Sequence, residues 1–114
     1  MIQSFCEEFK VHRGEFIDTN RIKKVWKESN TIEGALTAGR RMLDERERFQ
    51  LYISFKNFAE IPAFDDFVVN MKTGVSYRIL TCPNVRRTPV KAGIKCCVCT
   101  VTRADLPGGG VENG

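Results

Sequence analysis

The chain carries four of its five cysteines in its last third, which raises the question of a metal site. Cys96, Cys97 and Cys99, with Cys82 upstream, supply the four thiols that a structural zinc ion takes. In an extended segment, however, Cys96 points to the opposite side from Cys97 and Cys99, so three thiolates cannot converge without a break. Cys96 and Cys99 have the C-x-x-C spacing, but no second such pair and no neighbouring histidine supports the cluster. We therefore expect no metal ion or other cofactor, and interpret these cysteines as small buried apolar side chains.

Two further groups have the right chemistry for acid–base work. His12 is the single histidine, and it lies before Gly14 with no nucleophile beside it in the sequence. Asp65 and Asp66 are adjacent, so on an extended segment their side chains point apart and cannot share a metal ion or a proton. Turn formation explains both aspartates. We predict no catalytic residue, and a protein that is not an enzyme.

Basic residues recur in the expected loops and strand ends, where they could contact phosphates or an acidic protein surface. Between residues 40 and 48 acidic residues nearly balance them, which favours an ordinary solvated surface. Between residues 86 and 95 there is no acidic residue, so a contact role and a solvated surface remain equally open. The candidate contacts to a partner, a second subunit or a channel are Arg40, Arg41, Asp44, Arg46, Arg48, Arg86, Arg87 and Lys91.

The bulk properties indicate one small folded domain. The chain has 114 residues, 42% of them hydrophobic and 28% charged, and a net charge of +4. A core of this size is marginal, so association with copies or partners would stabilise it. The charge is weaker than that of a dedicated nucleic-acid binder. The first residues lack a signal-peptide pattern and no apolar run is long enough to span a membrane, so free thiols in a reducing cytosol are expected.

Alternation of apolar and polar residues predicts strands along most of the chain. The clearest segment is Asp65–Leu80, a hairpin in which Gly74 supplies the positive φ of a tight turn. The other expected strands are Phe5–Val11, Arg21–Ser29, Thr31–Leu36, Phe49–Phe58 and Ile94–Arg103. Loops are expected at residues 12–20, 59–66 and 82–93, and a short charged helix at Thr37–Arg48.

These elements predict a mainly β fold. We expect a small closed β-barrel or sandwich of six to seven antiparallel strands with one short helix or projecting loop, because closure removes exposed strand edges. The barrel domain is expected to span residues 1–103. Residues 104–114, which include Pro-Gly-Gly-Gly, are expected to form a disordered tail.

The order of these features resembles the head-closure (stopper) and head–tail joining proteins of tailed bacteriophages. The resemblance covers most of residues 5–103. It is carried by a Trp-bearing basic segment at Lys23–Glu28, by Asp66-Phe67-Val68-Val69, by a glycine turn and by a Tyr-x-Ile strand. Its motifs are short, and neither the loop near the amino terminus nor the cysteine-rich last strand has a counterpart in the family's pattern.

The resemblance implies a virion structural protein of the neck, assembled in the bacterial host cytoplasm. Such a subunit forms a homo-oligomeric ring of twelve or six copies below the portal and adaptor proteins. The ring retains packaged DNA, which passes near its channel, and offers a docking face to a tail-completion or tail-terminator protein; no membrane is involved. By the same resemblance, the segment around Thr37–Phe49 would project toward the channel or a neighbouring subunit.

An alternative remains open. A small OB-like or SH3-like barrel that binds nucleic acid would stack bases on aromatic rings and hold phosphates with loop arginines. The aromatic candidates for this function are Phe49, Tyr52, Phe55 and Tyr77. Because these residues alternate with polar ones as core residues do, we rank this alternative second.

Overall fold

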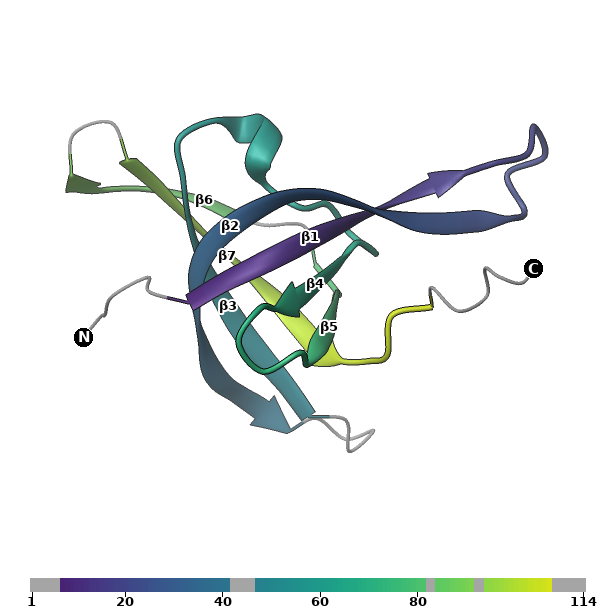
Figure 1. Cartoon of the computed structure of the whole chain (residues 1–114). Coiled ribbons are helices and arrows are strands. Elements are labelled where there is room, and N and C mark those ends of the chain that lie inside the picture. Colours follow the sequence, from purple (N-terminus) through teal and green to yellow (C-terminus); the bar gives the residue numbers. More distant parts are fainter. Residues whose placement is uncertain (1–6, 42–46, 82–83, 92–93, 108–114) are drawn as a thin grey trace.

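The computed structural model describes residues 7–41, 47–81, 84–91 and 94–107, with side chains left out at 38–41, 84–91 and 94–95. Seven strands and one short 3-10 helix follow one another along the chain (Figure 1). The strands are β1 (Glu7–Phe16), β2 (Lys24–Arg41), β3 (Glu47–Phe55), β4 (Phe67–Asn70), β5 (Ser76–Ile79), β6 (Asn84–Lys91) and β7 (Ile94–Arg103), and the helix is η1 (Phe58–Glu60).

One antiparallel sheet closes on itself. Its strand order is β3-β2-β1-β4-β5-β7-β6, and β3 also pairs with β7. The β3–β7 ladder runs from Arg48↔Thr102 to Phe55↔Lys95. The other edge of β7 is divided between β6 near its start and β5 near its end. The predicted mainly β, barrel-like fold is therefore confirmed.

The core consists of the side chains that alternate toward the inside of this sheet. Phe9 and Val11 of β1 are fully buried, as the alternation predicts. The other members of the buried cluster are Ile32, Leu51, Ile53, Phe55, Val68, Tyr77, Ile79, Cys97, Cys99 and Val101. Each strand except β6 is seen to contribute, so the core holds the whole ring of strands together.

The predicted β4–β5 hairpin is confirmed. Gly74 lies between the strands with φ +80°, the left-handed conformation that glycine adopts without a Cβ clash. The Asn70 side-chain oxygen accepts hydrogen bonds from the amides of Lys72 and Thr73, and the Gly74 amide donates to the Asn70 carbonyl at 2.7 Å. Local turn chemistry thus fixes the register that buries Tyr77.

The predicted helix at Thr37–Arg48 is wrong where the structure describes it. β2 continues to Arg41 and β3 begins at Glu47, while residues 42–46 lie outside the described residues. Leu36 pairs with Leu51, and Ala38 with Phe49, so these residues extend the barrel ladder. The helical stripe was thin, and ladder hydrogen bonds plus burial of Leu36 outweigh a weak helix propensity.

Three other boundaries also differ from the prediction. Residues 12–16, predicted as a loop, continue β1. The two strands predicted within residues 21–36 belong to one long β2. Both differences arise because β1 and β2 stay paired from Glu7↔Gly34 to Phe16↔Lys24. Part of the predicted basic loop at 82–93 is β6. Pro89 is tolerated there because β6 is an edge strand, with a register irregularity between Arg86 and Lys91.

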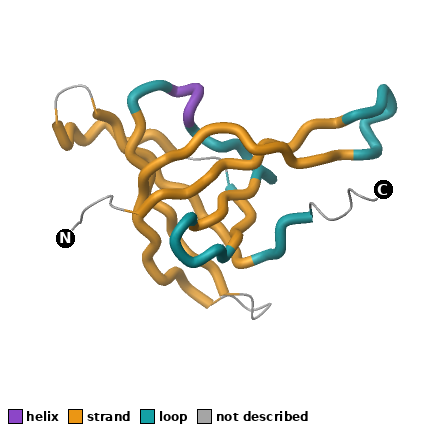
Figure 2. Tube along the Cα trace, in the orientation of Figure 1, coloured by secondary structure: helices purple, strands orange, loops and turns teal. Residues whose placement is uncertain are grey.

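Three hairpins extend from the barrel in different directions (Figures 1 and 2). They are formed by β1–β2, β2–β3 and β6–β7, and the β1–β2 hairpin is a two-stranded ribbon that leaves the barrel altogether. After β7, Ala104 is held by Ser76, whose hydroxyl donates to the Ala104 carbonyl at 2.6 Å. Residues 108–114 of the predicted tail lie outside the described residues.

In the described ranges, no helical segment reaches the length and hydrophobicity that a membrane span requires.

Substitution of Gly34 is expected to destabilise the barrel. A Cβ at this position would lie 2.6 Å from the Tyr52 carbonyl oxygen, which belongs to the paired backbone of β3 and cannot move away. We expect Gly34→Ala to lower the free energy of unfolding by about 1–3 kcal/mol, measured by urea denaturation. Thr37→Ala, at an exposed position of the same strand, is the control and should cost less than about 1 kcal/mol. If the two variants lost the same free energy of unfolding, the close approach between position 34 and the Tyr52 carbonyl would be contradicted.

Candidate assembly interface

The most prominent surface element is the arm, which we define as residues 13–27. The last β1–β4 pair is His12↔Phe67, so beyond His12 the first strand has only β2 as a partner. A two-stranded ribbon is marginal by itself in water. The arm must therefore be held by contacts at its base.

Asp66 forms one half of this base. Its side chain is buried, and one carboxylate oxygen accepts a hydrogen bond from the Gly14 amide at 3.0 Å. The other accepts from the Ala63 amide at 2.8 Å and lies 3.6 Å from a guanidinium nitrogen of Arg13. Arg13 also donates to the carbonyls of Ala59 and Ile61. These bonds fix the first strand of the arm to the connector before β4.

Asp65 forms the other half. Its carboxylate accepts from the Lys24 ammonium at 2.9 Å and from the Arg78 guanidinium at 2.6 Å, so it joins the second strand of the arm to β5. Its backbone carbonyl accepts from the Trp26 indole at 2.8 Å. The Trp26 ring meets Phe67 edge to face, with centroids 5.5 Å apart. Asp65 thus contacts the arm through both its side chain and its backbone.

Electrostatics favour the charged form of Asp65. Burial by itself raises the pKa of this carboxyl, but the hydrogen bonds and positive charges of Lys24 and Arg78 outweigh burial, and the pKa lies below its ordinary value. A group whose pKa is lowered by folding stabilises the folded state above its unfolded-state pKa, and this stabilisation is lost as the pH falls through the folded-state value.

Sequence reasoning assigned Asp65 and Asp66 only to a turn. That assignment holds in part. The Asp66 carboxylate accepts a hydrogen bond from the Ala63 amide within the loop, and Asp65 adopts a positive φ of 73°, as turn residues do. Their separate orientations were also predicted. The ion pairs with Arg13 and Lys24 were missed, since Arg13 lies 53 positions before Asp66 and Lys24 lies 41 positions before Asp65, separations that only the fold closes.

The far end of the arm is the tip, Phe16–Lys23. Asp18 orders it, because its carboxylate accepts hydrogen bonds from the amides of Ile22 and Lys23 at 2.9 and 3.0 Å. Arg21 has a positive φ of 58°, and its guanidinium lies 5.2 Å from the centre of the Phe16 ring. The result is a defined turn that presents cations and apolar side chains together.

The structure separates the predicted contact residues into two groups. Arg40 and Arg41 end β2 and Arg48 lies in β3, whereas Arg86, Arg87 and Lys91 lie in β6; Asp44 and Arg46 lie outside the described residues. Arg48 pairs with Thr102 and Arg86 with Cys96, six positions apart on β7. At about 3.3 Å per residue the groups are roughly 20 Å apart. They form two separate surfaces.

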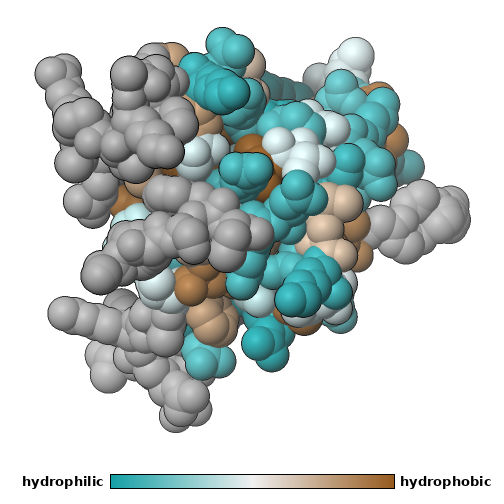
Figure 3. Space-filling model, turned by 60° about the vertical axis from the view of Figure 1, so that its left-hand side comes forward, coloured by the Kyte–Doolittle hydropathy of each residue, from teal (hydrophilic) through white to brown (hydrophobic). Residues whose placement is uncertain are grey.

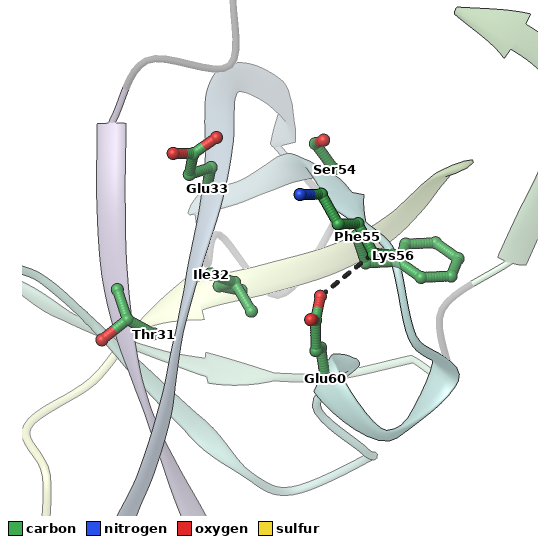
Figure 4. A pocket seen from close by; sticks show the side chains of 7 residues that line it. All are labelled: Thr31, Ile32, Glu33, Ser54, Phe55, Lys56 and Glu60. Carbon is green, nitrogen blue, oxygen red and sulfur yellow. Dashed lines mark hydrogen bonds between the residues drawn. The ribbon is translucent and has the colours of Figure 1, made fainter. Parts of the chain in front are cut away.

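One polar hollow of about 410 Å³ lies between β2 and η1. It is lined by Thr31, Ile32, Glu33, Ser54, Phe55, Lys56 and Glu60 (Figure 4). Glu60 accepts a hydrogen bond from the Lys56 amide at 3.1 Å, so this carboxylate already has a structural role. In the view of Figure 4, Glu33 lies on the opposite side of Lys56 from Glu60. This hydrogen bond ties the end of β3 to η1, so the hollow belongs to the framework of the barrel.

The cysteines of β7 and His12, whose side chains could carry chemistry, occupy structural positions. Cys97 and Cys99 point into the barrel, where burial raises the pKa of each thiol to about 12. His12 lies within β1 rather than at its end, beside a register irregularity, and burial is the largest effect on its pKa and lowers it. Within the described ranges, no three His, Cys, Asp or Glu side chains converge on a metal position.

Hydrophilic side chains cover much of the described surface on the face drawn in Figure 3, and the hydrophobic areas there are small. Comparisons with protein-family models, with curated proteins and with solved structures found no match to this chain. The resemblance to phage connector proteins therefore stays a prediction from the sequence motifs.

Replacement of Asp65 is expected to loosen the base of the arm. Asp65→Asn removes the charge shared by Lys24 and Arg78, and should lower the free energy of unfolding at pH 7 by about 1–3 kcal/mol. The wild type should also lose stability as the pH falls below the ordinary carboxyl value of 3.8, and the variant should lose less. Urea denaturation at pH 7 and at pH 3 measures both effects.

Glu15→Gln is the matched control. It removes the Glu15–Lys27 pair at 3.1 Å, whose side chains are both more than half exposed, and should cost less than about 1 kcal/mol. An equal loss for Asp65→Asn and Glu15→Gln would contradict the special role of Asp65.

The buried thiols should resist alkylation. Because the thiolate is the reactive form, Cys97 and Cys99 should stay unmodified by iodoacetamide at pH 8 in the folded protein and react fully in guanidinium chloride. Mass spectrometry of proteolytic peptides measures the modified fraction at each residue. Rapid labelling of either thiol under native conditions would refute the placement of the Cys97 and Cys99 side chains inside the barrel.

Proposed function

We propose that this chain is a structural subunit of the head–tail connector of a tailed phage or prophage. In this proposal it forms a ring below the portal or adaptor protein, closes the DNA-filled head and offers a docking surface to the tail. It has no catalytic role. The observation that carries the proposal is a closed barrel from which three strand-paired hairpins project.

This architecture suits assembly for a physical reason. The barrel is rigid because its sheet has a continuous core, and projecting elements on a rigid scaffold are where contacts concentrate. The arm is held at a fixed angle by Asp65 and Asp66, so it can meet a neighbour without a large ordering cost. The edge of β6 that pairs with none of the described strands supplies a second surface at which a strand of another chain could add.

The predicted contact residues fit two roles within such a ring. Arg40, Arg41 and Arg48 lie near the end of the β2–β3 hairpin, the segment that the family resemblance directs toward the channel or a neighbouring subunit. Arg86, Arg87 and Lys91 lie on the edge strand β6. Positive charge in the channel would face packaged DNA, and positive charge on the edge strand would face an acidic partner.

Nucleic-acid binding by an OB-like or SH3-like barrel remains the alternative. Two of its aromatic candidates, Phe55 and Tyr77, are buried in the core, and Phe49 packs against them. Base stacking needs exposed rings, and Tyr52, itself partly buried, is the one ring of the four that is not packed in or against the core cluster. The alternative therefore depends mainly on its arginines and lysines.

Assembly with the portal and adaptor proteins of the same phage or prophage tests the proposal. We expect the mixture to form a complex with a ring of this subunit, visible by negative-stain electron microscopy and by sedimentation velocity. A chain that remains monomeric when both partners are present would contradict the function. In parallel, filter binding to single-stranded DNA should show weak retention, whereas tight, salt-sensitive retention would favour the alternative.

A further inference from the structure

The tip of the arm exposes apolar side chains, although the Arg21 guanidinium and the Lys24 ammonium lie over the Phe16 ring. The exposed fractions are 42% for Phe16, 58% for Ile17 and 73% for Ile22. Exposed Arg21 and Lys23 lie between and beside them. Apolar patches rimmed by charge mark interaction sites, and this patch has a definite shape because Asp18 fixes the turn.

A hollow of complementary character lies at the other end of the same two strands. We call it the acidic hollow. It has a volume of about 440 Å³ and is lined by Glu7, Glu8, Glu33, Met71 and Lys72. Three carboxylates face one ammonium, and Met71, which is 52% exposed, supplies a flexible apolar surface. The Met71 amide donates to the Glu8 carbonyl at 2.9 Å, which ties the two sides of the hollow together.

One chain cannot bring its own tip to its own hollow. Both features belong to the β1–β2 ladder, whose register runs from Glu7↔Gly34 at the hollow to Phe16↔Lys24 at the tip. Nine steps along a strand correspond to roughly 30 Å. Figure 1 shows the arm extending away from the start of β1, so the two features lie at opposite ends of the β1–β2 ladder.

We propose that the tip of one copy docks into the acidic hollow of a second copy of this chain. Arg21 and Lys23 then meet the carboxylates of the hollow, and the apolar tip side chains cover Met71. Net charge favours this pairing over tip-to-tip or hollow-to-hollow contact, in which like charges would meet. The contact is heterologous, so its repetition gives a closed ring or an open filament. It rests on the proposed function, since it names the contact that would build the ring.

Charge reversal on each side separately provides the test. Arg21→Glu/Lys23→Glu makes the tip acidic and leaves the hollow acidic, while Glu8→Lys/Glu33→Lys makes the hollow basic and leaves the tip basic. Each variant alone should therefore assemble at least tenfold more weakly than the wild type in sedimentation velocity. Mixed in equal amounts, the two should assemble again, because each tip now meets a hollow of opposite charge. The alternation of variants in the mixed assembly restricts it to even numbers of subunits.

Two further variants sharpen the test. Lys56→Glu/Arg103→Glu changes the net charge as much as the tip variant does but at exposed positions outside the tip and the acidic hollow, so its assembly should match the wild type. Ile22→Ser keeps the charge and removes the most exposed apolar side chain of the tip, and should weaken assembly at least fivefold. Circular dichroism melting checks that every variant is folded.

The outcomes separate this contact from the proposed function. Recovery of assembly only in the mixture supports the contact. Rings that form equally well in all variants overturn the contact but leave the connector function standing. Filaments of indefinite length that obey the charge-reversal rule support the contact and contradict a ring-forming connector. A wild-type chain that stays monomeric at every concentration, or a mixture that fails to assemble, overturns the contact.

Discussion

The β3–β7 ladder is the constraint on which the remaining structure depends, because it joins two strands from distant parts of the chain and turns a sheet into a closed ring. Closure gives the inward side chains of six strands one common interior, in which Leu51, Ile53 and Val101 are fully buried. Among the described strands, it also leaves β6 as an edge that is paired on one side only. The same ladder sets apart the β2–β3 hairpin and β6, which lie toward opposite ends of β7.

A closed barrel needs a separate device to present anything beyond its wall. In this molecule the device is the arm, in which β1 and β2 simply continue past the last pair with β4. Two adjacent aspartates hold its base, each through a different strand: Asp66 through Arg13 and Gly14, and Asp65 through Lys24 and Trp26. Adjacent side chains that point apart cannot share one ligand, but they are well placed to hold two strands.

The distribution of charge and apolar surface gives the molecule a direction. The arm carries exposed isoleucines and cations at one end of the β1–β2 ladder, and the start of the ladder carries glutamates around Met71. In the head-to-tail contact that we propose, such complementary ends would build a closed ring or an open filament. This polarity, rather than any cluster of reactive groups, is the feature of the described surface on which the proposed assembly role rests.

The sequence by itself determined the strands whose side chains alternate, the β4–β5 hairpin with its Gly74 turn, and the inward cysteines of β7, because these follow from period-two patterning and local turn chemistry. It placed a helix at Thr37–Arg48 and a loop at residues 12–16, since a weak local preference cannot reveal that a distant strand offers a ladder. Only the tertiary structure decided the ion pairs of Asp65 and Asp66, the separation of the two arginine groups, and the opposite placement of tip and acidic hollow. Each of these depends on which strands pair and in which register, or on contacts such as that of Asp66 with Arg13 that join distant parts of the chain, and no local pattern encodes them.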